Sequence, residues 1–374
     1  MVDGPKAGIV TLQDVPNYGA ALQAFALKSI LGQFAQADVV NYHNRHASRD
    51  MELIRSARTL RQFMGTAKDL FRLASRRRTL ERFRDFQSVA LDLGPRLSAS
   101  ELKSRREDGR DAYVCGSDQI WNPNCVTADG TIDPVYFLDF ARHSRKIAYA
   151  ASIGHYKFNA IERKQIRSLL ADFSAISVRE AGAVDIIEPL VEKEVVHVLD
   201  PTLLIDRNGW EHLLPASSEV DPGLVTAPYV LVYSVPKSQL VAPAAEHFSV
   251  VCRSRTVCIE QDPFHRLPFA TTVSDAGPLE FLTLWSKARF VVTDSFHGVC
   301  FSIIFNKPFV AVSPGVHSSR IVSLLTMTGL MHRYALDRAG IAAMSDAVDF
   351  AQANEVLDSE RSKSVAFLRK ALLD

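Results

Sequence analysis

The chain contains 374 residues, of which 47% are hydrophobic and 23% are charged, and its formal net charge is +1. This balance is typical of a soluble globular protein and excludes a general electrostatic attraction to nucleic acid. No uninterrupted apolar run is long enough to span a bilayer, and the N-terminus shows no signal-peptide pattern. The five cysteines lack C-x-x-C spacing, which predicts reduced thiols, a cytoplasmic location and no zinc site.

Short buried strands alternate with helices through the first half of the chain. The predicted strands cover 8–12, 38–42, 112–115, 136–140, 146–152, 175–178 and 195–199, and helices are predicted at 20–31 and 160–171. This alternation predicts a parallel sheet whose ligands bind beyond the carboxyl ends of its strands. Asn17-Tyr18-Gly19, Ser117-Asp118-Gln119 and Arg179 follow such strand ends. For Arg179, a salt bridge with Glu180 or another neighbour is the alternative.

Residues 52–87 form a predicted helical and basic insertion. From Arg55 to Arg84 there are ten Lys and Arg residues against two acidic residues, a local charge of ten minus two, or +8. Apolar residues recur at helical spacing within it. The segment therefore has either the pattern of an amphipathic helix that contacts an anionic membrane or that of a solvated helical face.

A change to Pro, Ser, Gly and acidic residues between 215 and 228 predicts a domain boundary. Beyond it, strands are predicted at 229–233, 248–252, 256–259, 290–293 and 309–312, with helices at 278–288 and 299–305 and a helical tail over 346–373. The predicted fold class is α/β, with two doubly wound, Rossmann-like domains facing a cleft. These domains are residues 1–215, which include the basic insertion, and residues 225–374.

The strand–turn–helix–strand pattern over 290–312 carries the strongest local signal in the second domain. Asp294 or Ser295 is placed to cap the helix, and His297 and Gly298 follow at its start. A polar ring beside the unpaired N–H groups of a helix start suits a phosphate or a carboxylate. The alternative is a histidine that only packs or caps locally.

Several common catalytic patterns are absent from the sequence. There is no Asp-x-Asp metal triplet, no G-x-G-x-x-G and no G-x-x-x-x-G-K. The sequence therefore does not predict classical dinucleotide or P-loop chemistry. Asp294, Ser295 and His297 lie too close in one turn to relay a proton as a triad.

Six segments in a fixed order resemble the polysaccharide pyruvyltransferase family. They are NYGAALQAFAL (17–27), VCGSDQIWNP (114–123), KIAYAAS (146–152), ISVRE (176–180), VLDPTLL (198–204) and VVTDSFHGVCFSIIFNKPF (291–309). The family transfers pyruvate from phosphoenolpyruvate to sugar hydroxyls of bacterial surface glycans, and known members have a fold like the GT-B glycosyltransferases. The resemblance implies a pyruvate ketal on a bacterial surface polysaccharide or its lipid-linked precursor, with release of phosphate. Membrane contact through Arg55–Arg84 would place this cytoplasmic protein at the inner face of the cytoplasmic membrane.

The resemblance also implies roles for individual residues. It maps His297 onto the family's general acid and Arg179 onto an arginine that binds phosphoenolpyruvate. In well-studied members this histidine lies in an Arg-Leu-His run, but here Ser295 stands in place of that arginine, and Arg320 is the candidate for the lost charge. Asp118 is a possible base, and the scheme needs no metal or cofactor. The other expected substrate-binding residues are Asn17, Tyr18, Gly19, Ser117, Gln119, Ser295, Gly298, His317, Ser318, Ser319 and Arg320.

Two other classes of function stay open at this stage. One is a nucleotide-sugar glycosyltransferase with the same two-domain architecture. The other is a non-catalytic glycan-binding or assembly protein derived from such an enzyme, which the Ser295 departure suggests. The acceptor sugar and its linkage are not encoded in any motif of the chain.

Overall fold

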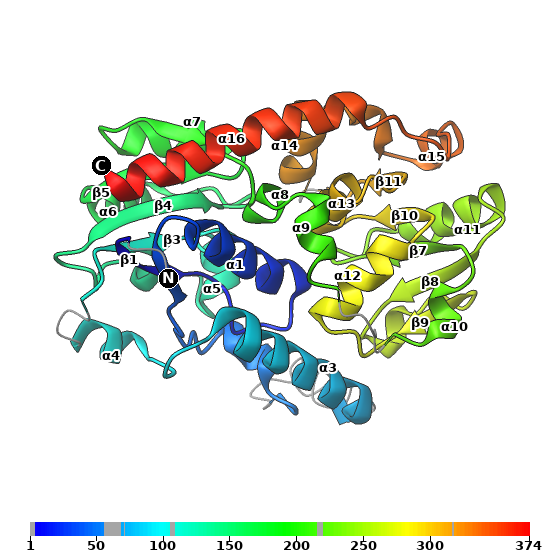
Figure 1. Ribbon diagram of the computed structural model, residues 1–374, viewed down its shortest axis with the longest axis horizontal. Helices are drawn as coiled ribbons and strands as arrows, with labels where there is room; N and C mark the ends of the chain where they lie inside the picture. The colour runs from blue at the N-terminus through cyan, green and yellow to red at the C-terminus, as the bar shows by residue number, and fades with distance from the viewer. Residues whose placement is uncertain (1–3, 56–68, 71, 105–108, 215–219, 316–317) are drawn as a thin grey trace. The chain divides into compact units, whose positions relative to one another are not determined.

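The structure is a computed structural model that describes residues 4–55, 69–70, 72–104, 109–214, 220–315 and 318–374 (Figure 1). The chain divides into two compact units. Unit 1 comprises Met1–Met51, Gln87–Leu204 and Ser359–Asp374, and unit 2 comprises Glu52–Phe86 and Ile205–Asp358. None of the helices formed by the described residues is both long and apolar enough to cross a membrane.

Unit 1 is built on a six-stranded sheet. Its strands are β1 (Lys6–Val10), β2 (Gln36–Val39), β3 (Ala112–Cys115), β4 (Arg145–Ala151), β5 (Phe173–Val178) and β6 (Val195–His197), in the spatial order β2-β1-β3-β4-β5-β6. Every neighbouring pair is parallel. The order reverses between β1 and β3, so the topological switch point lies beyond Val10 and Cys115, where ligands bind in sheets of this kind.

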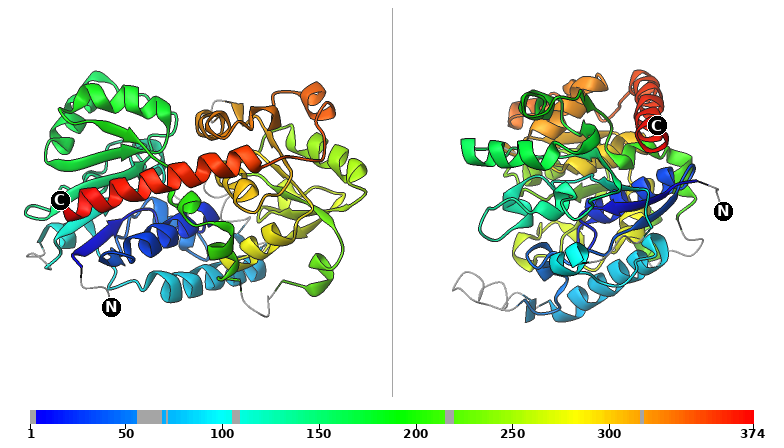
Figure 2. Two further views of the ribbon diagram at one scale, coloured as in Figure 1. Left: turned by 45° about the horizontal axis from the view of Figure 1, so that its top comes forward. Right: turned by 90° about the vertical axis from the view of Figure 1, so that its left-hand side faces the viewer.

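Helices connect the strands of unit 1 and cover its sheet. They are α1 (Tyr18–Leu31), α4 (Ala99–Ser104), α5 (Pro123–Val126), α6 (Ala160–Leu170), α7 (Ala181–Ile187) and α8 (Pro201–Leu204). The last helix, α16 (Ala351–Leu373), is the long red helix of Figure 2, and unit 1 includes it from Ser359 onward. Helix α1 is rich in Ala and Leu and is buried along most of its length, which is why it packs tightly within the unit.

Unit 2 repeats this architecture with a second six-stranded sheet. Its strands are β7 (Tyr229–Tyr233), β8 (Arg255–Ile259), β9 (Ala270–Val273), β10 (Phe290–Thr293), β11 (Phe309–Val312) and β12 (Tyr334–Ala335), in the order β12-β11-β10-β7-β8-β9. All pairings are parallel. The order reverses between β7 and β10, so the switch point lies beyond Tyr233 and Thr293.

The helices of unit 2 precede, connect and follow these strands along the chain (Figure 1). They are α3 (Leu73–Phe86), α9 (Arg207–Glu211), α10 (Pro222–Val225), α11 (Val241–Val251), α12 (Pro278–Lys287), α13 (Phe296–Ile304), α14 (Ser319–Met327) and α15 (Arg338–Ala342). Every residue of α13 is buried. A helix that is apolar on all sides is stable only inside a core, as its sequence predicted.

The strand predicted at 136–140 is wrong. Asp133 caps a 3₁₀ helix over Pro134–Phe137, and Leu138 ends it with a φ of 54°. Pro134 has no N–H to donate to a sheet. The aromatic side chains are buried without a strand, because Phe137 stacks on Trp121 with ring centroids 5.2 Å apart.

The strand predicted at 248–252 is also wrong, because these residues belong mainly to the end of α11. The buried residues of that helix are Val241, Ala244, Ala245 and Phe248, which is helical spacing. The β-branched residues near its end are more exposed: Val250 is 76% accessible and Val251 is 42% accessible. Strands β9 and β12 were not predicted, because they are only four and two residues long and give too short a pattern.

The two units differ from the predicted division in two segments. Glu52–Phe86 groups with unit 2, and Ser359–Asp374 groups with unit 1. In the first segment, Arg78 pairs with Asp275 at 2.7 Å. In the second, Ser364 accepts a hydrogen bond from the backbone of Leu199 at 3.1 Å. Both segments are thus fixed by long-range contacts that local composition does not encode.

Candidate active site

His297 lies in the first turn of α13, directly after strand β10 at the switch point of unit 2. Its side chain is buried, with 8% of the residue accessible. Ser295 is the N-cap residue, and its hydroxyl accepts a hydrogen bond from the N–H of Gly298 at 3.4 Å. The predicted position of His297 at a helix start beyond a parallel strand is thereby confirmed.

Asp294 does not cap α13 but holds the loop that follows β7. Its carboxylate accepts hydrogen bonds from the Ser234 hydroxyl at 2.7 Å, the Ser238 N–H at 2.8 Å and the Val235 N–H at 2.9 Å. Asp294 is 1% accessible. A buried carboxylate with three donors therefore joins the two loops that flank the switch point. The sequence analysis missed this loop, although its serines after a strongly apolar strand were a usable signal.

Arg320 and His297 both lie near the aromatic ring of Phe296. Its guanidinium carbon is 5.6 Å from the centroid of the Phe296 ring. The Phe296 and His297 rings are 5.2 Å apart at 70°. A cationic side chain and the imidazole thus share one aromatic neighbour. The replacement of the missing arginine by Arg320 stays a prediction.

Lys237 lies in the loop that follows β7, at the switch point of unit 2. Its backbone φ is 65°, in the left-handed region that residues with a side chain rarely adopt. Its ammonium pairs with Glu260, the residue after β8. The carboxyl edge of this sheet therefore carries an imidazole and two cationic side chains.

Unit 1 brings the other predicted residues together at its own switch point. The Asn17 side chain caps α1 and accepts a hydrogen bond from the Ala20 N–H at 3.1 Å. Tyr18 and Gly19 are buried in the first turn of α1. Asn17 therefore has a structural role as the N-cap of α1.

Ser117 lies at the centre of a buried polar network after β3. Its hydroxyl donates to the Ala150 carbonyl at 3.0 Å and lies 3.1 Å from Oδ2 of Asp200. Its N–H donates to the Gln23 side chain at 3.1 Å. The preceding Gly116 is required here, because a Cβ on it would lie 1.9 Å from the Tyr149 carbonyl oxygen at a φ of 124°.

Arg179 follows β5 and reaches this network with its whole guanidinium group. Nη1 donates to Asp200 at 2.8 Å and Nη2 lies 3.5 Å from Asp118. Burial lowers the pKa of Arg179, but the charges of Asp200, Asp118 and Glu180 outweigh it and raise the pKa above its ordinary value. Arg179 is therefore a permanent buried cation, and the salt-bridge alternative describes its contacts in this structure.

Gln119 and the turn around it are held by close backbone approach. The Gln119 side chain accepts a hydrogen bond from Asn122 at 3.0 Å. A Cβ on Gly154 would lie 2.1 Å from Oε1 of Gln119, and the Gly154 φ is 61°. Close packing against the loop after β4 therefore helps to fix the turn 117–119, in addition to the contacts of Ser117.

The remaining predicted residues lie at the start of α14 in unit 2. Ser318 is its N-cap residue without a side-chain cap hydrogen bond, and Ser319 and Arg320 open the helix. His317 lies outside the described residues. The predicted site residues therefore form two groups, one on each unit, and a shared cleft for both groups stays a prediction.

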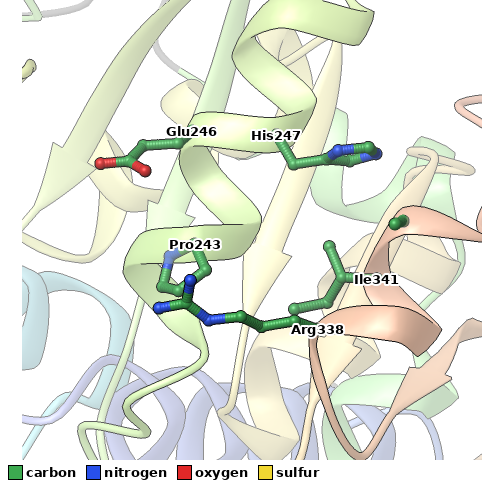
Figure 3. A pocket seen from close by; sticks show the side chains of 6 residues that line it. Pro243, Glu246, His247, Arg338 and Ile341 are labelled. Carbon is green, nitrogen blue, oxygen red and sulfur yellow. The ribbon is translucent and has the colours of Figure 1, made fainter.

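The residues that the structure describes contain no group of three or more His, Cys, Asp and Glu side chains arranged to hold a metal ion. A pocket of about 290 Å³ in unit 2 is lined by Pro243, Glu246 and His247 of α11 and by Arg338, Ile341 and Ala342 of α15. Figure 3 shows Glu246 and His247 pointing to opposite sides of α11. Polar groups do not converge in this pocket, and it contains none of the predicted site residues.

Most of the positive charge in the basic insertion is paired with carboxylates. Within this segment, each of six Arg side chains lies within 4.0 Å of an Asp or Glu oxygen: Arg55, Arg72, Arg76, Arg77, Arg78 and Arg82. Asp69, which is fully buried, is shared by three of them. These contacts favour a structural role in unit 2 for the described part of the segment.

Comparison with known structures supports the same architecture. A UDP-N-acetylglucosamine 2-epimerase matches with a TM-score of 0.55 at 10% sequence identity, covering 99% of this chain and 95% of the other. The UDP-N-acetylglucosamine 2-epimerase of Rickettsia bellii matches with a TM-score of 0.50 at 11% identity, covering 98% and 96% of the two chains. At this identity the likeness shows the fold alone, and it confirms the predicted GT-B-like α/β class with two Rossmann-like domains.

Comparison of the sequence itself is more specific. No curated protein matches the chain. The sequence model of the family described as polysaccharide pyruvyl transferase matches residues 17–315, a span that includes Ser117, Arg179 and His297. Because this match covers most of the chain and contains both switch-point edges, the protein belongs to the polysaccharide pyruvyl transferase family.

Proposed function

We propose that the protein transfers pyruvate from phosphoenolpyruvate to two hydroxyls of a saccharide, forming a cyclic ketal and releasing phosphate. The observation that carries this proposal is the position of His297, a buried imidazole at the start of α13 beyond the switch-point strand β10. The family supplies the class of reaction. The position of His297 supplies an acid beside a site suited to an anion.

The donor is an anion, and the carboxyl edge of unit 2 provides the charges that it needs. Phosphoenolpyruvate carries a phosphate and a carboxylate, so removing it from water requires fixed cations and N–H donors. The N-terminus of α13 contributes partial positive charge. Arg320 contributes a guanidinium next to the Phe296 ring. Lys237, whose ammonium pairs with Glu260, lies in the loop after β7.

The chemical step uses His297 as a general acid. A protonated imidazole donates its proton to C3 of the donor while a sugar hydroxyl forms a bond to C2. The resulting adduct loses phosphate, and a neighbouring hydroxyl of the same sugar bonds to C2 to close the ketal. The two hydroxyl protons end in the new methyl group and in the released hydrogen phosphate, so the step is balanced without an oxidant or a metal.

The acceptor in this proposal is a saccharide of a bacterial surface polysaccharide or of its lipid-linked precursor. Asp118 and Gln119 offer the carboxylate and amide groups that bind sugar hydroxyls, and the buried Ser117 helps to hold their turn. We place the reaction in the cytoplasm, and the five free cysteines agree with a reducing compartment.

The test is incubation of the purified full-length protein with phosphoenolpyruvate and candidate glycans, followed by mass spectrometry. We expect an acceptor whose mass increases by one ketal-linked pyruvate, with one phosphate released for each ketal. Parallel reactions with nucleotide sugars test the glycosyltransferase alternative. Sugar transfer from a nucleotide sugar, or phosphoenolpyruvate left unchanged with every acceptor tried, would overturn the proposal.

A further inference from the structure

A second polar cluster lies at the carboxyl edge of unit 1. Asp14 is in the loop after β1, at the switch point of the sheet, and His43 follows β2, the neighbouring strand. Nδ1 of His43 lies 3.4 Å from Oδ2 of Asp14. Nη2 of Arg96 donates to the same carboxylate oxygen at 2.5 Å. Asp14 thus holds an imidazole and a guanidinium at the edge where parallel sheets bind their ligands.

Asp14 and His43 each keep one hydrogen-bond acceptor unused. Both contacts of Asp14 use Oδ2, and Oδ1 forms no hydrogen bond within the described part of the chain. The carboxylate beside Nδ1 of His43 keeps the proton on that nitrogen, so Nε2 of the neutral ring is an acceptor. Nε2 has no hydrogen-bond partner among the described residues either. The side chains of His43 and Asp14 are 32% and 17% accessible, so solvent reaches both.

The loops that carry this cluster are anchored without it. The backbone N–H of His43 donates to the Leu97 carbonyl at 2.8 Å. The Gln13 side chain donates to the Tyr42 carbonyl at 3.1 Å, which joins the loop after β1 to the segment after β2. The ion pair of Arg96, whose side chain is 52% accessible, adds little stability. A role in binding therefore explains the cluster better than a role in holding the loops together.

The chemistry of the two unused atoms selects the kind of ligand. Oδ1 of Asp14 and Nε2 of His43 both offer lone pairs, and the charge of Arg96 is balanced by the carboxylate. Two adjacent acceptors disfavour a phosphate or a carboxylate, but they suit two hydroxyl groups, which donate. A saccharide presents such pairs of hydroxyls on one ring.

We propose that Asp14 and His43 form a saccharide subsite of unit 1, in which Oδ1 and Nε2 accept hydrogen bonds from two hydroxyls of one sugar residue. The inference rests on the proposed function only for the class of ligand, a saccharide, and needs no transfer of pyruvate. The Thr11 hydroxyl donates to the Ser117 carbonyl at 3.2 Å and so ties the loop after β1 to the turn after β3. The subsite therefore extends the edge of unit 1 that already carries that polar turn.

The experiment uses the full-length protein without phosphoenolpyruvate. Ligand-observed NMR measures the dissociation constants of the methyl glycosides of glucose, galactose, mannose and N-acetylglucosamine. The variants are His43→Asn, His43→Gln and Asp14→Asn, and the midpoint of thermal unfolding is measured for each. His46→Asn is the matched control, because His46 lies in the same segment and is exposed.

The two substitutions of His43 separate its two nitrogens. Asn still reaches Asp14 but has no atom in the place of Nε2, so His43→Asn should weaken binding of the best glycoside by about tenfold, the effect of losing one hydrogen bond. Gln places an amide oxygen near the position of Nε2, so His43→Gln should recover most of that affinity. In Asp14→Asn the amide oxygen must turn toward Arg96, which has only donors, and the NH₂ group replaces Oδ1. This variant should also lose about tenfold, whereas His46→Asn should match the wild type.

Wild-type binding in His43→Asn, or a His43→Gln variant that binds no better than His43→Asn, would overturn the inference. If a His43 variant does not fold, Asp14→Asn decides, since wild-type binding in that variant removes the pair as a subsite. Absence of binding of all four glycosides to the wild-type protein would overturn the inference as well. Glycoside binding that depends on His43, in a protein that leaves phosphoenolpyruvate unchanged with every acceptor, would keep this inference and refute only the proposed function.

Discussion

A single methyl group added at Gly298 should damage the site in unit 2. A Cβ on Gly298 would lie 2.2 Å from Oγ1 and 3.0 Å from Cβ of Thr293. Thr293 cannot rotate away freely, because its hydroxyl donates to the Tyr233 carbonyl at 2.7 Å and accepts from the Ser295 N–H at 3.1 Å. Gly298→Ala therefore forces either α13 or Thr293 to move.

The cost follows from the contacts that are lost. Overpacking in a rigid core costs about 1–3 kcal/mol. Loss of the Thr293–Tyr233 hydrogen bond adds about 1 kcal/mol. Alanine recovers about 1 kcal/mol through its higher helix propensity. The expected net loss of unfolding free energy is about 1–3 kcal/mol, and turnover should fall as well, because α13 carries His297.

Gly182 provides a matched control in α7. It also lies in the first turn of a helix, but a Cβ there meets no atom within 4 Å. Gly182→Ala should therefore be neutral or stabilising by up to about 1 kcal/mol. Chemical denaturation followed by fluorescence and circular dichroism measures both variants. Equal stability of Gly298→Ala and Gly182→Ala would refute the close-packing argument.

Three further predictions concern the acid, pH and membranes. His297→Gln should lower the rate of pyruvate transfer by about 10²–10⁴ and change donor affinity much less, because Gln keeps polarity but has no transferable proton. A wild-type rate in this variant would show that His297 has only a structural role. Burial lowers the pKa of His197 below its ordinary value of 6.5. The unfolded chain then binds more protons than the folded protein, so the free energy of unfolding should decrease as pH falls below 6.5. Denaturant titrations of His197→Gln should show a smaller decrease than those of the wild type. Identical pH slopes for the two proteins would exclude His197 as the source of the pH dependence. For the basic insertion, we expect equal retention by neutral and anionic vesicles, because most described Arg side chains are already paired; salt-sensitive retention by anionic vesicles alone would instead establish membrane contact through Arg55–Arg84.

The sequence predicted the elements that have strong local signals. The order of buried strands and amphipathic helices was sufficient for the α/β class and for two doubly wound units, because alternation of this kind has few compact solutions. It also placed His297 and Arg179 at the carboxyl ends of their strands, because strand and helix boundaries near them carry clear residue signals. The six family segments predicted the family that the sequence comparison then showed.

Errors occurred where burial and strand propensity look alike in sequence. The 136–140 run is aromatic because it packs on Trp121, and the 248–252 run is β-branched at the end of a helix. In both cases apolar residues pack in the core without pairing in a sheet. A local sequence pattern cannot distinguish such a buried segment from a strand.

The tertiary structure alone decided which partners the charged residues have. By itself, the sequence determined that Arg179 follows a strand, that Asp118 lies in a polar turn and that the 55–84 segment is basic. It did not determine that Asp200 and Asp118 hold Arg179, that Asp294 fixes the loop after β7, or that Asp69 is shared by three arginines. The physical reason is that helix and strand formation depends on neighbours a few residues apart, whereas an ion pair depends on atoms within about 4 Å that come from distant parts of the chain.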